Sequence, residues 1–261
     1  MNIVVCLKQV PGTTEVKIDP NTNTLIRQGI ENIINPFDTY ALEEAVRLKE
    51  KHGGKVTVIT MGPPQADAAL REAISLGADE AVLLSDRAFA GADTWATANT
   101  LAKAIFKLGK TDLIICGRQT IDGDTGQVGP EMAEMLNIPF VAYVSKIEEI
   151  KENYLRVSRM VEDGHEVIET NLPAVITVAK EINVPRLPSL RGIMKSKSAG
   201  IATWGIKELG VDANAVGLAG SSTQVIKFFF PQRVSKAEVL TGDAAAQVDK
   251  LIDKLKEANL I

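Results

Sequence analysis

The stretch LIICGRQTIDGDTGQVGPEMAEML, residues 113–136, carries the pattern that decides the fold. Its first four residues, Leu113 to Cys116, form an apolar run typical of a buried strand, and Val128 to Leu136 have the spacing of an amphipathic helix. A long loop with several glycines lies between them. A strand that leads through such a loop into a helix indicates one step of a parallel α/β sheet.

The same loop is a candidate phosphate-binding site. Glycines let the backbone approach a ligand closely, and the amides at a helix N-terminus attract phosphate. Asp122 and Asp124 complicate this interpretation because free carboxylates repel phosphate, so they should cap amides, bind sugar hydroxyls or point away. An ordinary loop whose aspartates form turns explains the same residues. The pattern alone therefore leaves a nucleotide site and a plain loop both open.

Apolar and amphipathic segments alternate on both sides of this stretch. Strands separated by helices predict an α/β fold, a Rossmann-like parallel sheet with helices on both faces in three layers. Ligands of such sheets bind at the carboxyl ends of strands, here after Leu7, Thr60 and Cys116. The other strands are predicted at residues 3–7, 56–60, 80–84, 140–144 and 174–178, the other helices at 36–50, 66–76 and 94–108, and hairpins near 17–27 and 155–171.

The segment Asn35-Pro36-Phe37-Asp38 has the composition of a helix start. Asn35 is a favoured capping residue, Pro36 fits the first helical position, and Asp38 suits the positive end of the helix dipole. A helix cap alone accounts for these residues without any ligand.

Composition and charge exclude several classes of function. Lysine and arginine number 29 and aspartate and glutamate 33, a net charge of −4, which argues against a surface that binds nucleic acid. Cys6 and Cys116 lie in apolar runs and suit a reducing compartment, and with two histidines they give no credible metal site. No dinucleotide fingerprint or serine nucleophile elbow occurs, so no catalytic residue is predicted.

No targeting sequence or apolar run of membrane-spanning length is evident, so we expect a cytoplasmic protein without a membrane span.

The alternation ends near residue 181. Residues 1–181 are predicted to form the nucleotide-binding α/β domain. Residues 182–261 are predicted to be a basic loop of little periodicity, then an extended arm that ends in a helix at 244–259. Such a tail either embraces a partner or packs on its own domain, and the pattern alone does not decide between these.

Several long motifs, in order along the chain, carry a family resemblance: VVCLKQVP, NPFDTYALEEAVRLKE, GRQTIDGDTGQVGPEMAE and RMVEDGHEVIETNLPAVITV. The chain resembles the β subunit of an electron transfer flavoprotein across essentially its whole length. The resemblance implies a domain that binds an adenine nucleotide and a heterodimer with a larger α subunit that carries FAD. The later motif RLPSLRGIMKSK resembles the loop by which this family recognises a partner dehydrogenase, with Leu190 as its apolar tip.

The resemblance also implies which residues contact the nucleotide. They lie at the first strand, at the start of the first helix, at the end of the second core strand and along the glycine-rich loop. They are Cys6; Asn35, Pro36, Phe37 and Asp38; Met61; and Gly117, Arg118, Gln119, Thr120, Ile121, Asp122, Gly123, Asp124, Thr125, Gly126, Gln127 and Val128.

The loop sequence DGDTGQVGP distinguishes two kinds of family member. Simple electron carriers tend to have a third acid where Gly123 stands, and they bind AMP. The sequence here resembles electron-bifurcating members, whose β subunit binds a second FAD, accepts hydride from NADH, and passes electrons towards an acyl-CoA-type dehydrogenase and ferredoxin. In that interpretation Thr125 and the amides of Gly126 to Val128 hold the pyrophosphate, and Arg118 lies near the isoalloxazine.

Two alternatives stay open at this point. The first is a non-bifurcating electron carrier subunit with structural AMP, which would not oxidise NADH. The second is a nucleotide-sensing module on the same general fold, which would form a homodimer without flavin. As an electron-transfer subunit, the chain is not expected to catalyse a reaction independently of its complex.

Overall fold

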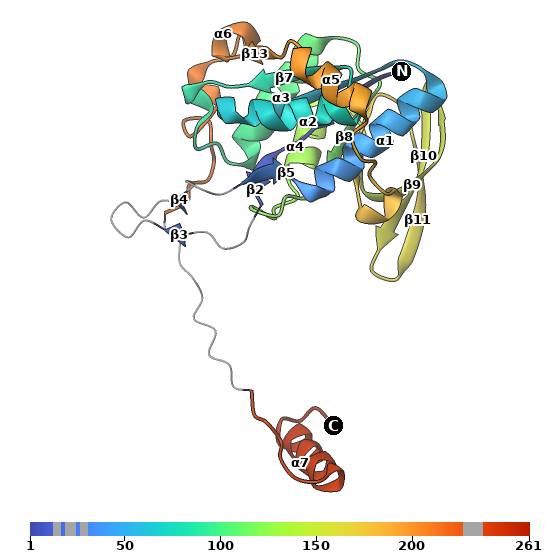
Figure 1. Ribbon diagram of the computed structural model, residues 1–261, viewed down its shortest axis with the longest axis vertical. Helices are drawn as coiled ribbons and strands as arrows, with labels where there is room; N and C mark the ends of the chain where they lie inside the picture. The colour runs from blue at the N-terminus through green and yellow to red at the C-terminus, as the bar shows by residue number, and fades with distance from the viewer. Residues whose placement is uncertain (13–16, 19–24, 27–30, 227–236) are drawn as a thin grey trace. The chain divides into compact units, whose positions relative to one another are not determined.

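The computed structural model describes residues 1–12, 17–18, 25–26, 31–226 and 237–261 (Figure 1). The chain divides into two compact units, Met1–Val225 and Ile226–Ile261. The first unit contains the sheet and every predicted site residue. In the described part of the second unit lies one helix, α7 (Ala244–Glu257), which begins with Asp243 accepting a hydrogen bond from the amide of Ala246.

A nine-stranded sheet runs through the described part of the first unit in the order β11-β10-β9-β12-β8-β1-β6-β7-β13. The pairs from β9 to β7 and on to β13 are parallel, whereas β10 pairs antiparallel with both β9 and β11. The strands are β1 (Asn2–Cys6), β6 (Lys55–Met61), β7 (Glu80–Leu84), β8 (Leu113–Gly117), β9 (Phe140–Lys151), β10 (Tyr154–Val161), β11 (Gly164–Thr170), β12 (Ala174–Val178) and β13 (Ala202–Trp204).

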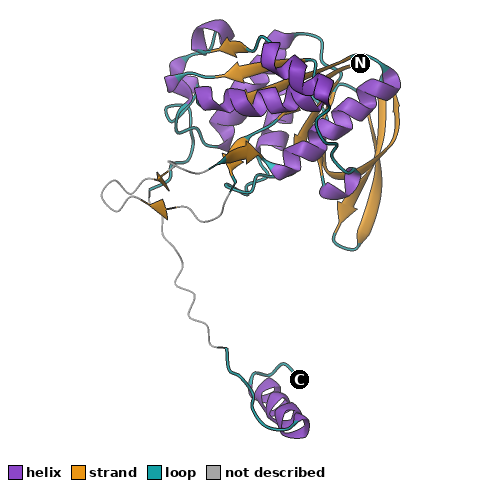
Figure 2. Ribbon diagram, in the orientation of Figure 1, coloured by secondary structure: helices purple, strands orange, loops and turns teal. Residues whose placement is uncertain are grey.

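Helices cover both faces of this sheet (Figure 2). On one face α1 (Pro36–His52) packs on β1, β8 and β12, α2 (Asp67–Leu76) packs on β6 and β7, and α5 (Leu190–Ser198) packs on α2. On the other face α3 (Thr94–Leu108) and α4 (Val128–Leu136) pack against each other and on the strands.

Short elements complete the first unit. They are the strands β2 (Gln9–Pro11), β3 (Lys17–Ile18), β4 (Leu25–Ile26) and β5 (Asn32–Ile34), the helix α6 (Ile206–Leu209), and single 3₁₀ turns at Pro64–Ala66, Arg87–Phe89, Lys180–Ile182 and Ala213–Ala215.

The central strand β1 shows why its sequence is apolar throughout. Ile3 and Val5 are buried in the cluster under α1 and α2, and Val4 and Cys6 are buried in the cluster under α3 and α4. Successive side chains of a strand point to opposite faces, so a strand covered on both faces needs apolar residues at every position.

The predicted fold class is confirmed by this mostly parallel sheet with its helices. The predicted helices at 94–108 and 128–136 end where α3 and α4 end, because Gly109 and Asn137 adopt positive φ values of 86° and 52°. The hairpin at 155–171 is the pair β10–β11, and β3 pairs with β4 in the predicted first hairpin, whose remaining residues lie outside the described ones.

The prediction of a loop of little periodicity after residue 182 is wrong in part. Residues 190–198 form α5, and Ala202–Trp204 add β13 to the sheet beside β7. Tertiary contact explains the difference: Gly192 lies so close to the carbonyl of Ser75 on α2 that a Cβ would be only 2.1 Å from its oxygen. Packing on α2 thus stabilises a helix that its own sequence supports weakly.

We expect Leu70→Ala to lower the free energy of unfolding by about 2–5 kcal/mol, because its side chain fills the core between α2 and the sheet at 0% exposure. Urea denaturation of the purified protein measures this. The control is Phe106→Ala on α3, where the side chain is 81% exposed and the effect should stay within about 0.5 kcal/mol. Equal losses for the two variants would contradict the packing described here.

Candidate functional site

The order of the strands places a candidate ligand-binding edge at the middle of the sheet. From β1 the chain continues to β6 and β7 on one side and then returns to β8 on the other side of β1. This reversal is a topological switch point, where the loops after β1 and β8 diverge at their carboxyl ends. The predicted segments at Cys6, Met61 and Gly117 all end strands at this edge.

Asp38 connects the two strands at the switch point. It is buried in the first turn of α1, where its Oδ2 accepts a hydrogen bond from the backbone N of Lys8 at 2.7 Å. Its Oδ1 accepts one from the backbone N of Gly117 at 3.2 Å. Burial raises the pKa of this carboxyl to about 7, although both amide hydrogen bonds and the charge of Lys8 favour the ionised form.

Gly117 is a glycine because α1 begins directly against it. A Cβ there would lie 2.4 Å from Oδ1 of Asp38 and 2.6 Å from the carbonyl carbon of Phe37. Even a methyl group would therefore separate the end of β8 from the start of α1.

The prediction that the Asn35 side chain caps α1 is wrong. Asn35 is fully buried, its Nδ2 donates to the carbonyl of Gln119 at 2.9 Å, and its Oδ1 accepts from the amide of Ile121 at 3.1 Å. The helix start has little need of a side-chain cap, because Pro36 has no N–H and the amide of Asp38 bonds to the backbone carbonyl of Asn35. Asn35 instead attaches the glycine-rich loop to α1.

The two aspartates of the loop are both engaged by neighbouring side chains. Asp122 forms an ion pair with Lys8, with Nζ 2.7 Å from Oδ2, and Asp124 accepts a hydrogen bond from the Gln119 side chain. Partial burial would raise the pKa of Asp122, but the hydrogen bond and charge of Lys8 outweigh it and hold that pKa below its usual value. The repulsion that these carboxylates would exert on a phosphate is thereby reduced.

The loop ends at the start of α4. Asp124 and Gly126 adopt left-handed backbone conformations, with φ values of 52° and 64°, and turn the chain into the helix. Gln127 makes no side-chain cap. The hydroxyl of Thr94, at the start of α3, donates to Oε1 of Glu131 at 3.0 Å and contacts Oε1 of Gln127 at 3.3 Å. Two helix N-termini therefore adjoin this loop.

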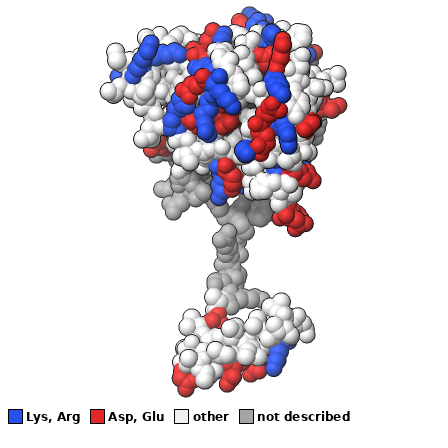
Figure 3. Space-filling model, turned by 90° about the vertical axis from the view of Figure 1, so that its right-hand side faces the viewer, with Lys and Arg blue, Asp and Glu red and all other residues white. Residues whose placement is uncertain are grey.

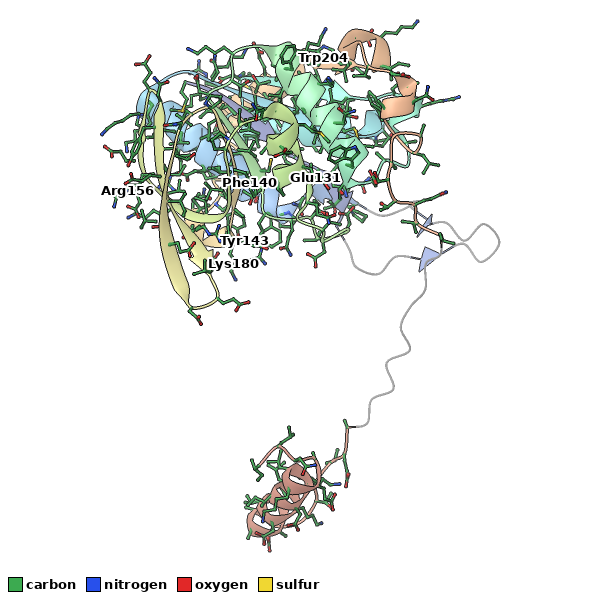
Figure 4. The ribbon with its side chains drawn as sticks, turned by 180° about the vertical axis from the view of Figure 1, so that it is seen from behind. Glu131, Phe140, Tyr143, Arg156, Lys180 and Trp204 are labelled. Atoms are coloured by element: carbon green, nitrogen blue, oxygen red, sulfur yellow. The ribbon has the colours of Figure 1, made fainter. Side chains whose placement is uncertain are left out.

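Arg118 contacts two aromatic rings. Its guanidinium carbon is 4.8 Å from the centroid of Phe37 and 5.9 Å from that of Tyr143. Tyr143, labelled in Figure 4, is 44% exposed and has a φ of 57° where β9 bulges opposite Thr177. A positive φ is uncommon for an aromatic residue, and the hydroxyl of Thr177 accepts its backbone N–H at 3.3 Å.

The structure thus brings the predicted residues of the first strand, the first helix and the loop to one edge. Cys6 faces α4, with its Sγ 3.9 Å from Sδ of Met132, and its hydrogen bond with Cys116 together with burial raises the pKa of its thiol. Met61 ends β6 at the same edge, half-buried. Leu190 is elsewhere, at the first position of α5 and 84% exposed.

Four residues that border the site were not predicted from the sequence: Lys8, Thr94, Glu131 and Tyr143. Lys8 could have been found, since it follows a strand whose end was expected to face a ligand. The other three depend on the packing of α3 on α4 and on a bulge in β9, for which we find no local signal in the sequence.

Comparison with known proteins decides the family. The model of the electron transfer flavoprotein domain matches residues 22–209. The electron transfer flavoprotein subunit beta of Thermoanaerobacterium thermosaccharolyticum is 53% identical over 100% of both chains. The chain belongs to the electron transfer flavoprotein β-subunit family. Subunit CarD of the caffeyl-CoA reductase-Etf complex of Acetobacterium woodii and the subunit beta of Clostridium acetobutylicum are each 50% identical, again over 100% of both chains.

Membership of the electron transfer flavoprotein β family gives the chain a role in electron transfer and implies an α-subunit partner. Among the residues described, no helix is long and apolar enough to cross a membrane.

We expect Asp38→Asn to loosen the link between β1 and β8, because an amide side chain has one acceptor oxygen where two backbone N–H groups need acceptors. In the wild type a similar loosening should appear as the pH falls through about 7, since a protonated carboxyl also loses one good acceptor. Amide hydrogen exchange at Lys8 and Gly117, measured between pH 8 and 6 and corrected for intrinsic rates, tests both expectations.

The global stability should not fall with this loosening. The native pKa of Asp38 lies above the unfolded value of 3.8, so the native state binds this proton more tightly, and the contribution of Asp38 to stability rises as pH falls from about 7 towards 4. Asp122→Asn is the control, because its carboxylate binds the side chain of Lys8 and neither of these amides. If the corrected exchange rates of the two amides change neither with pH nor in Asp38→Asn, Asp38 does not hold the two strand ends together.

Proposed function

We propose that this chain is the β subunit of an electron-bifurcating electron transfer flavoprotein and binds FAD at the edge formed by β1, β6 and β8. Two electrons would enter from NADH. One would leave through the FAD of the α subunit to an acyl-CoA-type dehydrogenase, and the other would reach ferredoxin. FAD would supply the one- and two-electron chemistry that side chains lack.

The observation that carries the proposal is the free space at Gly123. A Cβ at this position would meet nothing nearer than Oγ1 of Thr120, at 3.6 Å, so the loop keeps room beside its exposed backbone. Because Asp122 pairs with Lys8 and Asp124 accepts a hydrogen bond from Gln119, the loop also repels phosphate less strongly. Both features favour the binding of a diphosphate at this loop, whereas an acidic side chain at position 123 would fill the space and add a negative charge.

The chain's own residues would bind and orient this group. The hydroxyl of Thr125 and the amides from Gly126 to Val128 would hold the pyrophosphate at the start of α4. Residues 35–38, with Cys6 and Met61, would surround the adenine and ribose. Asp38 would hold the ends of β1 and β8 in place beside them, through the amides of Lys8 and Gly117.

Arg118 would place its cation near the isoalloxazine, where positive charge stabilises the reduced ring. Its Nε is buried and has no hydrogen-bond partner among the described residues, so it can donate to an acceptor that a ligand brings.

The partner dehydrogenase would bind at residues 184–198, which we call the docking segment. Its exposed apolar side chains are accompanied by Arg191, Lys195 and Lys197 and by no acid. One relative is by name a subunit of a caffeyl-CoA reductase-Etf complex, which supports a partner that acts on a CoA thioester. The exposed apolar side chains of α7 suit packing on the α subunit. A cytoplasmic location belongs to the same proposal, since Cys6 and Cys116 are unpaired.

The cofactor content of the heterodimer co-purified with its α subunit tests the proposal. After denaturation, chromatography should find two FAD and no AMP per heterodimer. One FAD and one AMP would contradict it and would make the chain a structural nucleotide binder in a simple electron carrier. A homodimer without flavin would indicate a nucleotide-sensing module instead.

We also expect Leu190→Ala to lower electron transfer to the partner dehydrogenase by about tenfold, because an exposed apolar side chain can anchor an interface. Nucleotide content and folding should stay unchanged, since Leu190 is 84% exposed. Steady-state kinetics with the dehydrogenase measure this. Phe106→Ala, on the opposite face of the sheet and 81% exposed, is the matched control. If Leu190→Ala behaves like the control, Leu190 does not bind the partner.

A further inference from the structure

Arg186 attaches the docking segment to α1. The guanidinium of Arg186 forms one pair of hydrogen bonds with Glu43, at 2.8 and 3.1 Å, and another with Glu50, at 2.6 and 2.9 Å. The backbone N of Arg186 also donates to Oε2 of Glu43 at 3.1 Å. Glu43 and Glu50 are two helical turns apart, so Arg186 lies along the outer face of α1. We call this arrangement the Arg186 clamp.

Neighbouring hydrogen bonds place the clamp at the N-terminal end of the docking segment. Just before it, Nδ2 of Asn183 donates to the carbonyl of Tyr40 and to Oε2 of Glu44, both at 3.0 Å. At the C-terminal end of the segment, Arg71 of α2 donates to the carbonyl of Ser196 at 2.8 Å, and Nζ of Lys195 donates to the carbonyl of Ala78 at 3.0 Å.

Two strongly exposed apolar side chains lie between the two ends of the segment. Leu187 and Leu190 are 89% and 84% exposed and flank Pro188 and Ser189. Ser189 caps α5, with its hydroxyl oxygen accepting from the amide of Gly192 at 3.0 Å. The apolar tip is thus supported at both ends, by α1 through Arg186 and by α2 through α5.

Stability alone explains the clamp poorly. The side chains of Arg186 and Glu50 are 33% and 54% exposed, and an ion pair with such access to water adds little to stability. The Glu43 side chain is 8% exposed, and the cost of burying its carboxylate offsets much of what its pair with Arg186 gains. A planar guanidinium that binds two carboxylates through paired bonds fixes orientation to a degree that a lysine cannot. The clamp therefore fixes the direction in which the docking segment runs from the surface of α1.

The clamp also shapes the charge of the docking surface. Without Arg186, the carboxylates of Glu43 and Glu50 would lose their guanidinium partner on the outer face of α1. On the face of the molecule that Figure 3 shows, acidic and basic side chains are interspersed. Arg186 offsets one of these two negative charges, and the docking segment itself carries Arg191, Lys195 and Lys197 and no acid, which favours a partner surface rich in acidic residues.

We propose that Arg186 is a positioning residue for partner recognition, which holds the apolar tip at Leu187 and Leu190 in its binding orientation through Glu43 and Glu50. This inference rests on the proposed role of the docking segment. A preformed tip binds with a smaller loss of conformational entropy than a loop that must first become ordered.

The test compares three variants of the αβ heterodimer. Arg186→Met removes the clamp, Arg186→Lys keeps its charge without the paired bonds, and Arg47→Met is the control. Arg47 lies on the same helix, and its one ion pair with a described residue is at 3.7 Å, with Glu44. The first readout needs no partner: the rate of tryptic cleavage after Arg191. We expect an increase of about fivefold in Arg186→Met, a smaller one in Arg186→Lys and none in the control.

The second readout is electron transfer to an acyl-CoA-type dehydrogenase that the wild type reduces. In Arg186→Met the KM for the dehydrogenase should rise about tenfold with kcat unchanged, because only binding is affected. Arg186→Lys should restore part of this loss, and the nucleotide content and the rate of NADH oxidation with an artificial dye should not change.

Two results would overturn the inference. Unchanged tryptic cleavage and KM in Arg186→Met would show that the clamp does not order the tip. A fall in kcat with loss of nucleotide would show that Arg186 acts through the fold. Failure of the proposed function gives a different result. Leu190→Ala would then leave the KM unchanged while Arg186→Met still increased cleavage. That result would contradict both the docking role of the segment and the role of Arg186 in recognition.

Discussion

The pair of hydrogen bonds that Asp38 accepts from the amides of Lys8 and Gly117 is the interaction on which the rest of the site depends. At a switch point the loops after two neighbouring strands diverge, so the backbone amides at the strand ends lack sheet partners. One buried carboxylate supplies acceptors for both and brings the start of α1 to the same place. The requirement for glycine at position 117 and the burial of Asn35 follow from this close approach.

Helix α1 thereby serves two regions of the surface. Its first turn joins the strand ends and, through Asn35, the glycine-rich loop. Its outer face holds the docking segment through Glu43 and Glu50. A helix is a rigid support because its backbone bonds are internal, and the same element can fix the strand ends at the switch point and the direction of the docking segment independently.

Much of the fold could be predicted because it depends on short-range patterns. Continuous apolar runs predicted the strands that helices cover on both faces, and glycine at position 109 ended α3 where expected. The candidate site stays a prediction, made at the level of segments from strand ends, glycines and family resemblance, and the structure places those segments at one edge of the sheet. Individual roles were harder: Asn35 fits a helix cap by type, yet its amide binds Gln119 and Ile121, more than 80 residues away in sequence. Helix α5 was missed because its stability comes from contact with α2.

The sequence by itself determined the alternation of strands and helices, the family, and the chemical types gathered at the strand ends, because hydrophobic periodicity and motif order are local properties. Only the tertiary structure decided how those residues are used. It buried Asp38 between two backbone amides, paired Lys8 with Asp122, and placed Arg186 against two carboxylates of α1. These partners are far apart along the chain, and they meet only because the sheet order and helix packing bring them together. A hydrogen bond or an ion pair acts over a few ångströms, so its partners are known only once the chain is folded.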